Sequence, residues 1–354
     1  MIKKLLYYLA VIRKYIIFAM YYYYTDKQML HERIKTRVVG VDINVDQTTY
    51  AVIDIRGHII ARDSFSSEDY PKINDYILKL SESILEIVEA NGGYESVRSI
   101  GISAPSANQL TGCIENAPNL PWKGVVPLAA MLRDSLGIAV VLGNDAYSFA
   151  LGEHAFGPAH GMKNFILVTI GSGTGSRFFS NGEPYNGNHG FSGEVGHICV
   201  EPGGRLCGCG KRGCLETYTA QKGFIQTARE VLAESELPST LRSVDKLTVR
   251  AIAEEAVAGD ELAKEVLHRT AEYLGLALAN YASIINPEAI ILTGDVTKGN
   301  QMLLEMVNEV FETHVFHNMK GKVKLVLSQI DEQELNLLGA SVMAWDVKEY
   351  SLFL

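Results

Sequence analysis

His197-Ile-Cys-Val-Glu-Pro-Gly-Gly-Arg-Leu-Cys-Gly-Cys-Gly-Lys-Arg-Gly-Cys-Leu-Glu216 is the stretch that says most about the fold of this chain. Structural zinc sites use four tetrahedral nitrogen and thiolate ligands. One histidine and three of the four cysteines in this glycine-rich stretch predict such a site, with the ligands His197, Cys207, Cys209 and Cys214. A disulfide is the alternative, but disulfides are more typical of small secreted domains than of a chain of 354 residues with five cysteines.

Two carboxylates flank this predicted zinc site. Glu194 lies three residues before His197, and Glu216 lies two residues after Cys214, so a bound metal would fix both acids relative to one imidazole. A carboxylate can accept hydrogen bonds from two neighbouring hydroxyls. We therefore predict that Glu194, His197 and Glu216 bind a polyhydroxylated ligand, with one ring nitrogen of His197 on zinc and the other donating to a sugar oxygen.

Composition indicates an ordinary globular protein that uses small ligands. The chain is 47% apolar and 21% charged, and its length predicts two domains. A net charge of −9 and a pI near 5.5 argue against a general nucleic-acid surface, which would be basic. A cluster of reduced thiolates indicates a cytoplasmic protein.

Residues 1–37 do not match the rest of the chain. Two apolar runs, 5–12 and 15–24, are separated by Arg13-Lys14, and neither reaches the roughly 20 residues of a membrane span. No small-residue cleavage site follows, as a signal peptide would need. We interpret the segment as a non-family leader, with an interfacial helix as the alternative, and expect no stable membrane insertion.

The first part of the chain predicts an α/β domain. Three β-rich runs at 38–43, 49–55 and 58–62 read as an antiparallel meander, with Arg56-Gly57 as a tight turn. A helix at 73–88, a strand at 97–104, a helix at 127–136 and a strand at 138–142 follow. Strand, helix and strand in this order indicate parallel pairing.

The same scheme then starts again. Strands are expected at 165–170 and 176–180, helices from Thr248 and Asp260, and strands at 289–293 and 323–327. We predict a leader at 1–37, an N-terminal domain at 38–146 closed by a C-terminal helix at about 335–354, and a C-terminal domain at 147–334. The zinc-binding segment 194–216 belongs to the second domain. Two similar halves would enclose one cleft.

A glycine-rich turn separates the first two strands of the second half. Gly171, Ser172, Gly173, Thr174 and Gly175 follow one strand and open another, whereas the dinucleotide-binding pattern needs a helix there. Glycines let backbone N–H groups approach an anion closely, although many such hairpins only turn the chain. Gly294 follows a strand of the same half, so a nucleotide could lie between the two loops.

Asn144-Asp145 follows a predicted parallel strand, where open α/β sheets place ligands. A helix cap is the alternative role for such an acid. Phosphoryl transfer needs positioning, charge neutralisation and a carboxylate that receives the acceptor's proton, and Asp145 fits that last role.

On these motifs the chain resembles the ROK sugar kinases, and within them the bacterial glucokinases. The similarity covers about residues 38–345 and is most specific at 193–197, 207–216, 143–146 and 116–122. The resemblance implies an actin-like (ribonuclease H-like), duplicated two-domain α/β fold with a cleft between the domains. It also implies structural zinc, ATP with magnesium, and transfer of the γ-phosphate to the 6-hydroxyl of glucose or a related hexose. Family members are commonly homodimers.

The resemblance also implies roles for particular residues. Asp145 matches the catalytic base, and Asn144, Asp145, Glu194, His197 and Glu216 match the sugar-binding set. The phosphate-binding set corresponds to Asp42, which would hold magnesium through water, and to Gly171, Ser172, Gly173, Thr174, Gly175 and Gly294.

One departure from the family pattern opens an alternative function. Glucokinases of this type have Asp-x-Gly-Gly-Thr in the first hairpin, where this chain has Asp42-Ile43-Asn44-Val45-Asp46. Val45 adds a β-branched side chain where backbone should approach phosphate, and Asp46 adds negative charge. The alternative is a catalytically weak sugar sensor or regulator. The 37 residues before Val38 show no basic recognition helix, so no nucleic-acid partner is expected.

Overall fold

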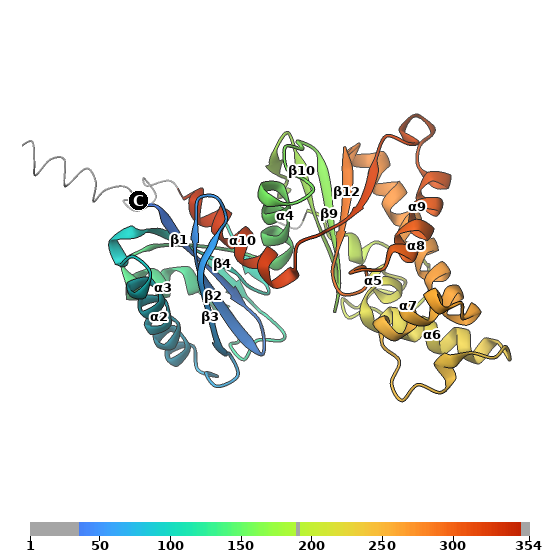
Figure 1. Ribbon diagram of the computed structural model, residues 1–354, viewed down its shortest axis with the longest axis horizontal. Coiled ribbons are helices and arrows are strands. Elements are labelled where there is room, and N and C mark those ends of the chain that lie inside the picture. The colour runs from blue at the N-terminus through green and yellow to red at the C-terminus, as the bar shows by residue number, and fades with distance from the viewer. Residues whose placement is uncertain (1–34, 189–191, 348–354) are drawn as a thin grey trace, which may run out of the picture.

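Two five-stranded mixed sheets form the core of the protein in the computed structural model, which describes residues 35–188 and 192–347 (Figure 1). The predicted leader 1–37 lies almost wholly outside these ranges, and so do residues 348–354 of the predicted closing helix. No helix within the described ranges is long and apolar enough to cross a membrane.

The first sheet has the strand order β3-β2-β1-β4-β8. Its first three strands pair antiparallel, as the predicted meander requires, and β4 and β8 extend the sheet in parallel with β1. The bounds are β1 Arg37–Ile43, β2 Gln47–Asp54, β3 Ile59–Ser66, β4 Val97–Ser103 and β8 Ala139–Gly143. Strand β1 is buried on both faces, which explains its continuous apolar sequence.

The second sheet repeats this topology in the order β11-β10-β9-β12-β13. Strands β9 and β10 form the predicted hairpin, and β12 and β13 extend it in parallel. The bounds are β9 Phe165–Ile170, β10 Thr174–Ser180, β11 Glu183–Pro184, β12 Ala289–Thr293 and β13 Lys324–Leu327. The prediction of a duplicated α/β fold is therefore confirmed.

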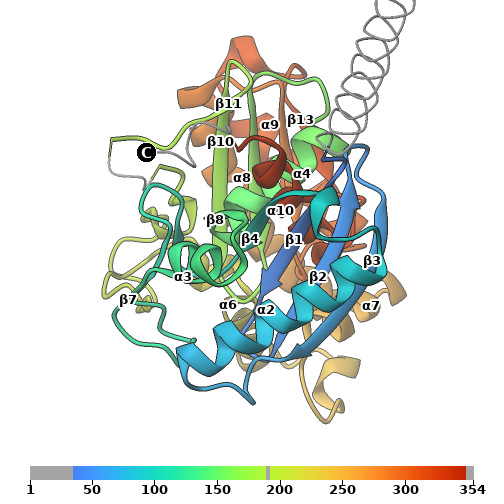
Figure 2. The same cartoon turned by 90° about the vertical axis from the view of Figure 1, so that its left-hand side faces the viewer.

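Helices cover both faces of each sheet. On the outer face of the first sheet, Val39, Val41 and Ile43 share one apolar core with α2 (Ile73–Ala90) and α3 (Leu128–Leu136). Figure 2 shows these two helices lying against the sheet. The outer face of the second sheet packs against a helical layer that belongs to the same core. That layer consists of α5 Glu216–Thr219, α6 Gln221–Glu234, α7 Val249–Ala258, α8 Glu261–Ile285 and α9 Gln301–His314.

Two helices, α4 (Asp145–Phe156) and α10 (Glu332–Trp345), lie between the sheets (Figure 1). Helix α10 packs on β1 and β4, whereas α4 packs on β9 and β10. Glycines make this contact close: a Cβ atom at Gly101 would lie 1.8 Å from the Ala340 carbonyl oxygen, and one at Gly339 would lie 1.8 Å from that of Ser148. The C-terminal helix therefore closes the first sheet, as predicted, and joins it to the second half.

A small third sheet lies beside the cleft and was not predicted from the sequence. It consists of β5 Ala107–Asn108, β6 Cys113–Glu115 and β7 Val125–Val126. Strands of two or three residues are too short to show an alternating pattern.

Candidate functional site

A cavity of about 770 Å³ lies between the two halves. Every residue for which the sequence predicted a catalytic, sugar-binding or phosphate-binding role lines it. They are Asp42, Asn144, Asp145, Gly171, Ser172, Gly173, Thr174, Gly175, Glu194, His197, Glu216 and Gly294. The structure thus brings the predicted site residues together, and their roles remain predictions.

Three neighbouring strands place two aspartates side by side. Asp42 lies near the end of β1, in register with Ser103 at the end of β4, and Ser103 is in register with the last residue of β8. Asp145 is the first residue of α4, two positions beyond β8. Because the carboxyl ends of parallel strands meet at one edge of a sheet, the two carboxylates face the same cleft.

Asn144, and not Asp145, caps helix α4. Its side-chain oxygen accepts a hydrogen bond of 2.9 Å from the backbone N–H of Tyr147, so Asn144 is the N-cap of α4. Asp145 is therefore not needed as the cap, and its carboxylate is available to the cleft.

Both acids have raised pKa values. Burial, reinforced by the negative charge of Asp145, raises the pKa of Asp42 to about 7, against the opposing effect of the nearby Asn336 amide and of a hydrogen bond from Asn44. Burial raises the pKa of Asp145 to about 6, although a hydrogen bond from Ser103 favours the ionised form. The residue Asp145 keeps some exposure, but its carboxyl group is enclosed by protein at the base of the cleft.

Sequence reasoning missed two residues that connect these acids. The Ser103 hydroxyl lies 3.2 Å from Asp145 Oδ1 and 2.9 Å from Asn336 Oδ1, and Asn336 in turn faces Asp42. Asn336 belongs to α10, nearly 300 positions after Asp42. The available signal was a polar residue between buried Leu335 and Leu337 in an apolar helix.

The glycine-rich hairpin between β9 and β10 is hydrogen-bonded to the predicted zinc-binding segment. Glu216 Oε2 accepts a hydrogen bond of 3.1 Å from the backbone N–H of Thr174. A Cβ atom at Gly173 would lie 2.9 Å from that same oxygen, so this glycine permits the close approach. The Thr174 hydroxyl is also engaged, at 2.9 Å from the hydroxyl of Thr219. Thr174 therefore lines the cavity with its N–H and its hydroxyl already paired.

The four predicted metal ligands form one cluster. Their ligand atoms all lie within 4.8 Å of one another. Cys209 Sγ is 3.7 Å from Cys214 Sγ, and Cys207 Sγ is 3.7 Å from His197 Nδ1. Two sulfurs at about 2.3 Å from a tetrahedral zinc ion lie about 3.8 Å apart, so the cluster has the dimensions of a zinc site.

The cluster also directs the histidine ring. Because Nδ1 of His197 faces the cysteines, Nε2 is left for the cleft that the same residue lines. All five cysteines of the chain are free thiols in the structure. The structure therefore does not contain the disulfide that was the alternative to the metal site.

The first hairpin, which departs from the family pattern, presents side chains to the cleft. Asn44 and Asp46 line the cavity, whereas Val45 is exposed outside the set of lining residues. The Asn44 side chain donates a hydrogen bond of 2.9 Å to Asp42 Oδ2. The substituted residue Asn44 therefore supports Asp42.

A further cavity of about 460 Å³ continues past Gly294. It shares Gln221 and Asp295 with the main cavity and is otherwise lined by α7 and the loop that precedes α9. The two cavities together form a long cleft, with one end near the histidine and cysteine cluster and the other beyond the glycine loops.

The fold and the site define an actin-like, two-domain α/β protein with a histidine and cysteine cluster beside its cleft. Residues 38–347 match the model of the ROK family, and the chain belongs to that family. This confirms the resemblance found in the sequence.

The most similar relatives include kinases and regulators. A glucokinase of Halalkalibacterium halodurans is 38% identical over 220 residues, which are 61% of this chain and 66% of that relative. The crystal structure of a ROK family glucokinase from Streptomyces griseus, in complex with glucose and AMPPNP, has a TM-score of 0.71 and 26% identity, covering 88% of this chain and 100% of that one. A ROK family transcriptional regulator, a homolog of the E. coli Mlc protein, has a TM-score of 0.78 and 26% identity, covering 88% of this chain and 79% of that one.

Proposed function

We propose that this protein is an ATP-dependent hexose kinase that phosphorylates the 6-hydroxyl of glucose or a related hexose. The observation that carries the proposal is the convergence of Asp42 and Asp145 with Glu194, His197 and Glu216 in one cavity. Asp42 and Asp145, at the ends of strands, can bind a metal and accept a proton. Glu194, His197 and Glu216 can form hydrogen bonds with the hydroxyls of a sugar. The glucokinase relatives support the same assignment.

Asp145 is the proposed catalytic base. Its carboxylate would accept the proton of the 6-hydroxyl as the hydroxyl oxygen attacks the γ-phosphorus, while the bond from the γ-phosphorus to the β,γ-bridging oxygen breaks and ADP leaves. A pKa of about 6 keeps Asp145 ionised at neutral pH and leaves it a stronger base than an exposed aspartate. The hydrogen bond from Ser103 to Oδ1 orients the carboxylate.

Asp42 fits the role of a magnesium ligand. Its Oδ1 atom is buried and has no hydrogen-bond partner among the described residues, while Oδ2 accepts from Asn44. Buried carboxylate oxygens without a partner are costly, and a divalent cation removes the cost. Bound magnesium would neutralise charge on the phosphates, and Asp42 would hold it directly or through water.

The loop at 171–175 is the proposed phosphate contact. In the described part of the chain, the N–H groups of Ser172 and Gly173 donate to no backbone carbonyl, so they are free to approach phosphate oxygens. The cavity beyond Gly294 would take the nucleoside part of ATP.

The histidine and cysteine cluster is proposed to bind structural zinc. Burial, together with the neighbouring cysteines, raises the pKa of the Cys214 thiol to about 12, and a divalent cation at the centre would stabilise the thiolates. Zinc would fix His197 and Glu216, which then contact the sugar with Glu194 and Asn144.

The test is a coupled assay with ATP, magnesium and glucose, fructose, mannose, N-acetylglucosamine or N-acetylmannosamine. In a variant Asp145→Asn, kcat should fall about 10²- to 10⁴-fold, since general-base catalysis contributes that much. Its affinity for the sugar should stay within about threefold of the parent. Asp134→Asn, which changes an exposed acid on α3, is the matched control. Comparable turnover in Asp145→Asn would show that this residue only binds the sugar.

A sugar-binding regulator without turnover is the second candidate. The substituted hairpin at 44–46 and the similarity to a transcriptional regulator favour it. In the same assay it predicts sugar binding by calorimetry and no phosphorylation of any sugar in the panel.

We also propose the domain limits 38–146 and 147–334 and a homodimeric assembly. Separate apolar cores on the two sheets support a division into two domains. Sedimentation equilibrium would test the dimer.

A further inference from the structure

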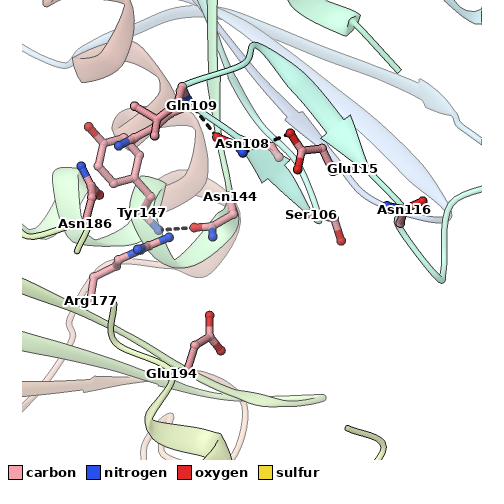
Figure 3. A pocket seen from close by; sticks show the side chains of 12 residues that line it. Ser106, Asn108, Gln109, Glu115, Asn116, Asn144, Tyr147, Arg177, Asn186 and Glu194 are labelled. Carbon is pink, nitrogen blue, oxygen red and sulfur yellow. Dashed lines mark hydrogen bonds between the residues drawn. The ribbon is translucent and has the colours of Figure 1, made fainter. Parts of the chain in front are cut away.

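A separate cavity of about 480 Å³ opens beside the proposed sugar site (Figure 3). It shares Ser106, Asn144, Arg177 and Glu194 with the main cavity, but Asp145 and the glycine loop do not line it. Its volume is in the range of small-molecule sites. It therefore extends the sugar end of the cleft away from the proposed site of phosphoryl transfer.

The wall of this cavity carries backbone strain. Ser106 has a φ of 55° and Asn116 a φ of 52°, in the left-handed region that residues other than glycine rarely adopt. Residues with strained backbone conformations are often found at ligand-binding sites, where contacts with the surrounding structure maintain the strained conformation. Amide side chains complete the lining, from Asn108, Gln109, Asn116, Asn144 and Asn186.

Arg177 on β10 is the unusual residue of this site. Its side chain is buried, with 7% exposure, and Figure 3 shows its guanidinium reaching toward Tyr147 and Asn144. Nη1 donates to the Ser192 carbonyl at 3.2 Å, and the guanidinium carbon lies 6.0 Å from the centre of the Tyr147 ring. The Nε atom is buried and has no hydrogen-bond partner in the described ranges, and no carboxylate there comes within 4.0 Å of the guanidinium.

A buried cation without an ion pair is costly unless a ligand pairs with it. Glu194 interacts with the guanidinium electrostatically but at a longer range than an ion pair. Glu115, the other acid of this cavity, is occupied by hydrogen bonds from Asn108 at 3.0 Å and from Thr111 at 2.7 Å. Nη2 of Arg177 has no hydrogen-bond partner among the described residues and, unlike Nε, is not among the enclosed atoms, so it is the donor left for a ligand.

The distribution of charge restricts which ligand can use that donor. Among the described residues that line the two cavities, Arg177 is the only lysine or arginine. The carboxylates that line them are Asp42, Asp46, Glu115, Asp145, Glu194, Glu216 and Asp295. An oxyanion without a bound metal would be repelled elsewhere in the cleft, and Arg177 marks the one place where it would be attracted.

We propose that Arg177 makes this cavity a subsite for an acidic substituent on the sugar, carried by a carbon other than C6. This inference rests on the proposed function, which places C6 at Asp145. The substituent is a phosphate monoester or a carboxylate, because a guanidinium recognises both through the same N–H donors. The preferred substrate is then an acidic sugar, and glucose is a poorer ligand.

The test is calorimetric titration of the full zinc-loaded chain without ATP, so that binding is measured independently of turnover. Glucose 1-phosphate is compared with glucose, and N-acetylmuramic acid with N-acetylglucosamine. At least one acidic sugar should bind about 10- to 150-fold tighter than its neutral parent, the range expected for a hydrogen bond between charged groups. The phosphate and carboxylate pairs distinguish the two sources of the oxyanion. Glucuronate, with its carboxylate at C6, should bind more weakly than glucose.

Variants of Arg177 test whether this residue binds the acidic substituent, or whether the affinity depends only on the net charge of the protein. Arg177→Met should remove the advantage of the acidic sugar and leave the neutral parent within about threefold, whereas Arg177→Lys should keep part of the advantage. Arg133→Met, an exposed arginine on α3, should change neither. Acidic sugars that bind no tighter than their parents, or an advantage that persists in Arg177→Met, would overturn this inference alone. If no sugar binds the parent chain at all, the proposed function fails with it.

Discussion

Replacing Asp42 by asparagine should stabilise this protein at pH 8, although the residue is proposed to bind magnesium. Burial raises the pKa of Asp42 from 3.8 to about 7. The unfolded chain therefore releases this proton near pH 4 and the folded protein near pH 7. Between these values the folded state holds a proton that the unfolded state lacks, so the free energy of unfolding falls as pH rises.

The size of the effect follows from the shift. About three pKa units correspond to about 4 kcal/mol of destabilisation at pH 8, and roughly 1 kcal/mol of it is already present at pH 4.5. Asparagine removes this term and can still accept the hydrogen bond from Asn44. Its own amide would be buried where Oδ1 now lies, at a cost of about 1–3 kcal/mol that is the same at both pH values. The difference between the two pH values is therefore the informative quantity, and it should be about 3 kcal/mol in favour of the variant at pH 8.

Urea unfolding at pH 4.5 and pH 8, with zinc present and no added magnesium, measures this difference. Asp46→Asn is the control, because Asp46 lies exposed in the same hairpin and its loss should change stability little. Added magnesium should stabilise the parent at pH 8 and leave Asp42→Asn unchanged. An equal effect of Asp42→Asn at both pH values would refute the reasoning, since it would mean that the folded state does not disfavour the ionised carboxylate.

Three further predictions concern the zinc cluster, the first hairpin and the base. Cys209→Ser should lose zinc and weaken sugar binding about tenfold or more, because Glu216 and its neighbours lose their support; a zinc-free variant with full sugar affinity, by elemental analysis and calorimetry, would contradict it. Restoring Gly-Gly-Thr at Asn44, Val45 and Asp46 should tighten ATP binding in calorimetry, and an unchanged affinity would show that the hairpin does not contact phosphate. At saturating magnesium, which would keep Asp42 ionised, the kcat/KM for the sugar should fall tenfold per pH unit below about pH 6, as Asp145 is protonated; a flat profile down to pH 5 would exclude Asp145 as the base.

Local patterns were sufficient to predict most of the two sheets and the zinc cluster. Runs such as β1 and β9 are apolar because both of their faces are buried, and the spacing of the cysteines from 207 to 214 limits which atoms can meet. The repeat of the strand order could also be recognised, since each half begins with a hairpin.

Helix α4 was missed for a physical reason. An amphipathic helix shows an apolar stripe, but α4 packs against α10 on one side and against β9 and β10 on the other. Its buried residues therefore lie all round the helix, and no stripe appears in its sequence. Arg177 and Asn336 were missed because their neighbours come from distant parts of the chain, which a single sequence does not place together.

The comparison of the two hairpins bears on the choice between kinase and sensor. The β9–β10 hairpin keeps its glycines and N–H groups that can face an anion, while the β1–β2 hairpin has lost its glycines and kept Asp42. A protein that only binds sugar near the zinc cluster has no use for a buried carboxylate with a pKa of about 7 and an unpaired oxygen. Such a group destabilises the fold at neutral pH, and proteins hold strained ionisable groups of this kind mainly where they act. Asp42, together with the adjacent Asp145, therefore supports the proposed kinase over the proposed sensor, and the magnesium dependence of stability is the measurement on which the two proposals differ.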